Sequence, residues 1–176
     1  QPDRNYGTDE LFQVWANSNS NRRGLLRFDL SSIPANATIN YATLYIYTRD
    51  SRSGVMTSVY RVTSDWSETT ATWNSPWNSA GGDFDNQVAY ATYYPNTADC
   101  MITLNITQLV ARWVNGTYEN YGLLLYSSGS NYAYRYISKD ETTDLQLRPR
   151  LNINYITPDG NSGTSIIQFT GDVDKP

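Results

Sequence analysis

Apolar and polar residues alternate along most of this chain, which is the pattern of β-strands. In the stretch 39–48 the alternation places aliphatic residues on one face and tyrosines on the other, namely Ala42, Leu44 and Ile46 against Tyr41, Tyr45 and Tyr47. Because both faces carry apolar bulk, we expect this strand to be covered on both sides. Further strands are predicted at residues 11–16, 24–30, 55–63, 88–94, 100–104, 121–127, 132–137, 150–156 and 165–170.

One segment follows a helical period instead. Between residues 106 and 114 the apolar side chains recur at the spacing of a helix with a single buried stripe. Thr107 or Asn105 can cap its start, and Gly116 can end it in a left-handed conformation. A helix this short needs tertiary packing, so it should lie across the strands by its apolar stripe. The predicted fold class is therefore all-β, a jelly-roll-like β-sandwich with one short helix.

Composition agrees with this fold and excludes several classes of function. The 176 residues, with 15 Tyr and 5 Trp, are enough to bury one core without disulfides. The net charge of −4 argues against a nucleic-acid partner, which would require a basic face. No apolar run reaches the length of about 18 residues that a membrane span requires, so no such span is expected.

Catalysis is not expected either. The chain has no histidine, which removes the commonest general base and the commonest metal ligand. The single cysteine, Cys100, therefore has no histidine to activate it, and its apolar neighbours favour a buried, inert thiol. A glycosidase needs a pair of carboxylates, and Glu68 is better suited to a structural hydrogen bond. The sequence predicts a protein that is not an enzyme.

Several segments, in the right order, resemble the DNRLRE-domain family. The most specific is the run from Trp66 to Asn74, Trp-Ser-Glu-Thr-Thr-Ala-Thr-Trp-Asn, followed by Pro76. The others are residues 5–8, 23–34, 37–39, 42–47, 106–116, 120–123 and 148–151. The resemblance covers roughly residues 3–156 and implies a β-sandwich with one short helix in an extracellular or cell-surface protein. That family is related to archaeal disaggregatase and includes carbohydrate-binding modules of alginate-degrading systems.

The chain departs from this family at its start. Members usually begin with a strand just before the Asn-Tyr-Gly loop, which here is residues 5–7, and that strand is missing. The C-terminal segment 169–174 resembles it. We therefore predict a β-sandwich over residues 1–156, a flexible linker over 157–164, and a C-terminal strand over 165–176 that completes a sandwich.

The sandwich that this strand completes is either its own or that of a neighbour. A missing strand leaves an unpaired edge, which a chain fills by folding back or by donating the strand to another subunit. Donation repeated from head to tail gives a filament. The residues expected to enter the slot are Ile166, Ile167, Phe169 and Val173. The leading functional hypothesis is thus a non-catalytic extracellular structural protein, a subunit or repeat of a filament or surface layer, with copies of itself or adjacent repeats as partners.

The alternative hypothesis is a carbohydrate-binding module for an acidic polysaccharide. Sugar rings stack on exposed aromatic side chains, and the candidates are Tyr45 and Tyr47 with Tyr41, or Tyr134 and Arg135 with Tyr132 and Tyr136. Acidic sugars would require arginine, for which Arg23, Arg27 and Arg135 are candidates. The simpler interpretation is that these tyrosines pair across strands or fill the core.

Two further features concern ions and modification. Asp83 and Asp85, which follow a Gly-Gly pair, offer oxygen ligands for a structural Ca²⁺, although the spacing lacks a full ligand set and a solvated loop is simpler. No other cofactor is predicted. Asn36 and Asn115 begin Asn-x-Ser/Thr sequences in predicted loops and are predicted glycosylation sites. Asn105 begins a third such sequence but is better placed to cap the helix.

Overall fold

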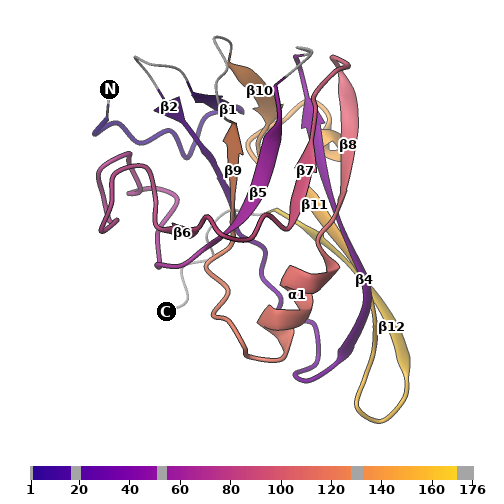
Figure 1. Cartoon of the computed structure of the whole chain (residues 1–176). Coiled ribbons are helices and arrows are strands. Elements are labelled where there is room, and N and C mark those ends of the chain that lie inside the picture. The colour runs from indigo at the N-terminus through magenta and orange to yellow at the C-terminus, as the bar shows by residue number, and fades with distance from the viewer. Residues whose placement is uncertain (1, 17–20, 51–54, 128–132, 170–176) are drawn as a thin grey trace.

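The computed structural model describes residues 2–16, 21–50, 55–127 and 133–169 (Figure 1). In chain order the elements are β1 (Leu11–Ala16), β2 (Asn21–Arg22), β3 (Gly24–Leu26), β4 (Thr38–Thr48), β5 (Thr57–Val62), β6 (Phe84–Asp85), β7 (Ala91–Tyr93), β8 (Cys100–Asn105), α1 (Thr107–Val114), β9 (Leu123–Ser127), β10 (Tyr134–Ile137), the short 3-10 helix η1 (Leu145–Leu147), β11 (Arg150–Ile156) and β12 (Ser162–Gln168).

The strands form two antiparallel sheets. The larger sheet has seven strands in the order β12-β11-β4-β10-β1-β2, with β8 also paired to β4. The smaller sheet has five strands in the order β3-β9-β5-β6, with β7 also paired to β5. Apolar side chains from the facing surfaces of both sheets form the main core. This arrangement confirms the predicted all-β sandwich with one short α-helix.

Strand β4 shows the alternation that its sequence predicts. Its aliphatic residues Ala42, Leu44 and Ile46 are fully buried in the core. Its tyrosines lie on the outer face, where Tyr41 is 49% exposed and Tyr45 is half-buried. The expectation that both faces are covered is therefore wrong for the outer face. The tyrosine rings lie there partly exposed to solvent.

Helix α1 packs as expected. It buries Leu109, Val110 and Trp113 and ends before Gly116, whose φ of 74° lies in the left-handed region. Asn105 Oδ1 accepts a hydrogen bond from the backbone N–H of Thr107 at 3.0 Å. The predicted stop signal is confirmed, but the N-cap is Ile106, which makes no side-chain cap bond, and Asn105 acts from one residue before it.

The predicted strand 24–30 is shorter in the structure and ends at Leu26. Beyond it, the carbonyl of Phe28 accepts a hydrogen bond from the side chain of Asn120 at 2.9 Å. Gly122 also approaches closely, because a Cβ there would lie 2.3 Å from the carbonyl oxygen of Leu26. Beyond Leu26, a hydrogen bond from the Asn120 side chain therefore replaces backbone pairing between strands.

The C-terminal strand β12 pairs with β11 of the same chain over all seven of its residues. It begins at Ser162, so part of the predicted linker 157–164 is strand, and a turn closed by the Thr157 N–H to Asn161 carbonyl bond replaces the rest. Ile166 is 64% exposed, whereas Phe169, just after the strand, is 4% exposed. The Phe169 ring packs on Phe28 at 5.7 Å. Val173 lies outside the described residues.

We expect Phe169→Ala to lower the free energy of unfolding by about 3–5 kcal/mol, since it would leave a cavity in the core. The matched control is Ile166→Ala, three residues earlier on β12, which should change stability by less than about 0.5 kcal/mol because that side chain is exposed. Urea denaturation of both variants measures the difference. Equal effects would contradict the packing of Phe169 in the core.

Candidate functional site

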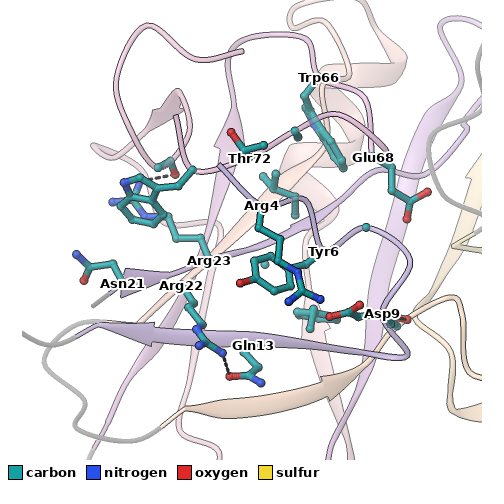
Figure 2. Close-up of a pocket in the computed structure, with 18 of the residues that line it drawn as sticks. Arg4, Tyr6, Asp9, Gln13, Asn21, Arg22, Arg23, Trp66, Glu68 and Thr72 are labelled. Carbon is teal, nitrogen blue, oxygen red and sulfur yellow. Dashed lines mark hydrogen bonds between the residues drawn. The ribbon is translucent and has the colours of Figure 1, made fainter. Parts of the chain in front are cut away.

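A groove of about 580 Å³ runs along one side of the sandwich. Its walls are the N-terminal segment 2–9, the strands β1 to β3 and the loop 66–81 (Figure 2). Its polar lining includes Arg4, Asp9, Gln13, Arg22, Arg23 and Glu68, and its aromatic lining includes Tyr6, Phe12, Trp66, Trp73, Trp77 and Phe169. The groove therefore combines rings with charged groups.

The side chain of Asn5 holds the N-terminal wall in place. Its Nδ2 donates to the carbonyls of Glu68 at 2.6 Å and Ala71 at 2.7 Å, and its Oδ1 accepts from the N–H of Gly7 at 3.0 Å. Gly7 itself lies directly against the loop, since a Cβ there would be 2.2 Å from the carbonyl oxygen of Glu68. The Asn-Tyr-Gly sequence thus fastens this segment across the molecule.

Two tryptophans anchor the opposite wall. Trp66 and Trp77 are buried, and together with Val62 and Leu124 they form a second, smaller core. The Trp66 indole N–H donates to the Tyr121 carbonyl at 2.7 Å, and that of Trp77 donates to the Thr72 carbonyl at 2.8 Å. Since the indoles are fixed, the loop between them has a defined shape.

Arg23 lies at the base of the groove between aromatic rings. Its guanidinium is 5.0 Å from the ring centre of Trp73, 4.9 Å from Phe84 and 5.3 Å from Tyr126. Its Nη1 donates to the Gly81 carbonyl at 2.5 Å, while its Nε is buried without a partner. Burial lowers the pKa of Arg23 from its ordinary value. Within the described ranges Arg23 makes no ion pair.

Arg4 and Arg22 add two exposed cations. Figure 2 shows Arg4 and Tyr6 in the middle of the groove, and the Arg4 guanidinium lies 4.9 Å from the Tyr6 ring centre. Arg22 stacks over Trp15 at 5.6 Å and hydrogen-bonds to Gln13. In the part of the chain that the structure describes, neither arginine makes an ion pair.

The acidic side chains of the groove only partly balance these arginines. Three arginines face the two carboxylates of Asp9 and Glu68, and Glu68 is already paired with Lys139 at 3.5 Å. The groove is thus locally positive on a chain whose net charge is −4. Such a surface favours an anionic ligand.

The first pair of tyrosines suggested for sugar stacking, Tyr45 and Tyr47, lies outside the groove. Tyr45 and Tyr47 are on the outer face of β4, where the guanidinium of Arg150 is 4.5 Å from the Tyr45 ring centre and that of Arg49 is 5.3 Å from the Tyr47 ring centre. Neither tyrosine lines the groove. Each ring already carries a guanidinium on one of its faces.

The second candidate set for sugar stacking, Tyr134 and Tyr136 with Arg135, is not available on the surface as that hypothesis requires. Tyr134 and Tyr136 are fully buried, because the alternation of β10 turns them into the core rather than to solvent. Tyr136 receives a hydrogen bond from Tyr93 at 2.9 Å, and burial raises its pKa to about 12. Arg135 is exposed but binds Asp50 through two hydrogen bonds of 2.9 Å. Tyr132 lies outside the described residues.

Of the arginines suggested by the sequence, only Arg23 reaches the groove. Arg27 pairs with Asp65 at 2.6 Å. Reasoning from the sequence missed Arg4, Arg22 and Tyr6, although the Asn-Tyr-Gly motif that positions two of them was visible. No pattern of alternation connects residues 4–6 with residues 66–73.

The two carboxylates suggested for Ca²⁺ have partners within the protein. Asp83 accepts hydrogen bonds from Ser64 Oγ, from the N–H of Ser79, and from both the backbone and the side chain of Asn78. Burial alone would raise the pKa of Asp83, but these bonds outweigh it and hold the pKa below its usual value. Asp85 pairs with Arg61 at 3.3 Å. No cluster of three metal-ligating side chains occurs among the described residues.

The predicted glycosylation sites are at the surface. Asn36 is exposed in a turn, with a φ of 62°, and Asn115 is exposed just after α1. Asn115 Oδ1 accepts hydrogen bonds from Thr117 N at 3.0 Å and Thr117 Oγ1 at 2.6 Å. Both asparagines are accessible, and their glycosylation stays a prediction.

A β-sandwich with an open groove lined by aromatic rings and polar side chains is typical of carbohydrate-binding modules. The chain belongs to carbohydrate-binding module family 96, whose model matches residues 1–155. This membership supports the carbohydrate-binding alternative over the filament hypothesis, and the DNRLRE name itself stays a prediction. No curated protein matches the chain. No helix in the described ranges is long and apolar enough to cross a membrane.

We expect Asn5→Ala to destabilise the protein by about 1–3 kcal/mol, because it leaves two partly buried carbonyls without donors. Asn74→Ala is the matched control, since Asn74 joins the same two segments through an exposed bond to Asp3 of 2.7 Å. Its effect should stay below about 0.5 kcal/mol. Thermal denaturation measures the stability of both variants, and hydrogen exchange at the Gly7 N–H reports the loss of its bond to Asn5. Slow exchange at Gly7 in the Asn5 variant would count against this role.

We also expect the melting temperature to be the same in excess Ca²⁺ and in excess EGTA. The oxygens of Asp83 are already used as hydrogen-bond acceptors, so an ion would have to displace those donors. Differential scanning fluorimetry measures the midpoint, with Mg²⁺ as the control ion. An increase in midpoint with Ca²⁺ alone would restore the ion site.

Proposed function

We propose that this protein binds an acidic polysaccharide in the arginine-lined groove. The observation that carries the proposal is Arg23, a partly buried guanidinium that lines the groove, lies against aromatic rings and the Gly81 carbonyl, and makes no ion pair among the described residues. A buried charge without a counter-ion is unfavourable. A carboxylate or sulfate group of a ligand would supply the opposite charge at the part of the guanidinium that lines the groove.

The exposed cations extend this contact along the groove. In Figure 2 Arg4 lies in the middle of the groove and Arg22 lies beside Gln13, and both arginines are solvent-exposed. A polymer with an acidic group on each sugar unit can therefore meet more than one guanidinium at once. Tyr6, which is 45% exposed, offers a ring face against which a sugar can stack.

Membership of a family of binding modules is compatible with a non-catalytic role. Acidic polysaccharides of this kind lie outside cells, so the proposed location is extracellular or at the cell surface. The filament hypothesis has no support from the family, and β12 already pairs with β11 of its own chain. Binding in the groove needs no second copy of the protein.

The test is affinity for alginate and polygalacturonate, measured by calorimetry for the wild-type protein and the variants Arg22→Gln and Arg23→Lys. We expect each variant to bind at least about tenfold more weakly, because each loses a charged or bidentate contact. Binding should also weaken as salt is added. Arg23→Lys keeps a positive charge near the aromatic rings, so it should disturb the fold less than a neutral substitution at this partly buried position.

Arg112→Gln is the matched control, because Arg112 is an exposed arginine on α1 that does not line the groove. Its affinity should equal that of the wild type. The proposal fails if the wild type binds neither polymer, or if Arg112→Gln weakens binding as much as Arg22→Gln does.

A further inference from the structure

A second pocket, of about 440 Å³, lies where β4 and α1 begin. It is lined by Asn40, Tyr41, Tyr90, Asn105, Thr107 and Gln108. In Figure 1 α1 and the start of β4 are at the end of the molecule away from β1 and β2, which border the groove. The two cavities share no lining residue.

Three amide side chains give this pocket defined hydrogen-bonding groups. Asn40 donates through Nδ2 to Asn154 Oδ1 at 2.7 Å, which leaves its own Oδ1 as an acceptor. Asn105 accepts through Oδ1 from the Thr107 N–H at 3.0 Å, which leaves its Nδ2 as a donor. Gln108 is exposed at the first turn of α1, where it can supply both. Two of the three amides are thus held in orientation before any ligand arrives.

Tyr41 supplies the aromatic face. It is 49% exposed, whereas Tyr45 and Tyr47 on the same side of β4 are half-buried and stacked with Arg150 and Arg49. The strand register places Asn105 beside Thr43, two residues from Tyr41 and on the same outer face. The ring and the amides therefore border one surface.

The pocket has no charged residue in its lining. An acidic sugar would gain no ion pair here, in contrast to the groove. Paired amide donors and acceptors instead match the neighbouring hydroxyl groups of an uncharged sugar, and an exposed ring matches its apolar face.

We propose that this pocket is a second carbohydrate site, which binds a neutral glycosyl unit against Tyr41 through the amides of Asn40, Asn105 and Gln108. The site is independent of the proposed groove site and differs from it in the charge of its ligand. One module would then contact both an acidic and an uncharged polysaccharide.

The probes are uncharged hexasaccharides of β-1,4-glucan, β-1,4-xylan, β-1,4-mannan and β-1,3-glucan. Titrations are followed by amide chemical shifts in about 0.5 M NaCl, where the screening length is below about 5 Å and charge contacts in the groove are weak. We expect at least one probe to bind and to shift the signals of Asn105 and Gln108. Tyr41→Ala should weaken that binding by at least about tenfold.

Tyr94→Ala is the matched control, because Tyr94 is 54% exposed and lines neither cavity. It should leave the affinity unchanged, as should the groove variant Arg22→Gln. Conversely, Tyr41→Ala should leave binding of alginate unchanged, so failure of one site is distinguished from failure of the other. The second site is ruled out if no probe binds at about 5 mM, if Tyr41→Ala behaves like Tyr94→Ala, or if the shifts map to the groove.

Discussion

Strand β4 is the constraint on which the larger sheet depends. It pairs with β11, β8 and β10, so its register sets the positions of three neighbours. Its fully buried aliphatic residues fix that register, because a slip of one residue would turn Ala42, Leu44 and Ile46 out to solvent. The same alternation places Tyr41 on the outer face beside the amides of the second pocket. One strand pattern thus determines both the core and that surface.

The positive groove and the acidic chain are compatible because electrostatic effects in water are local. At physiological ionic strength charges are screened over about 8 Å, so the net charge of −4 matters less at the groove than its own arginines do. Arg23 is also partly shielded from water by Trp73, Phe84 and Tyr126, which leaves its charge less screened. Ligand preference therefore follows from side chains within contact distance, and overall composition is a poor guide to it.

Sequence patterns predicted the strands and the helix well because their signals are local. The helix 107–114 and the strand 150–156 follow from side-chain spacing alone. The same spacing cannot say which face of a strand meets solvent. Tyr134 was a candidate for exposed sugar stacking, and the structure instead bears out the simpler interpretation that it fills the core. The groove was missed for a different reason. Asn5 bonds to residues 63 and 66 positions away, and no local pattern encodes such a contact.

The C-terminal strand connects the family match with the groove. The family model ends at residue 155, yet β12 extends the larger sheet beyond it, and Phe169 both fills the core beside Phe28 and lines the groove. Phe169 therefore lies at the boundary between core and groove. A displacement of the Phe169 ring would therefore disturb the core and the groove together. The strand that suggested assembly is, in this fold, paired with β11 of its own chain, and it is followed by a residue that lines the groove.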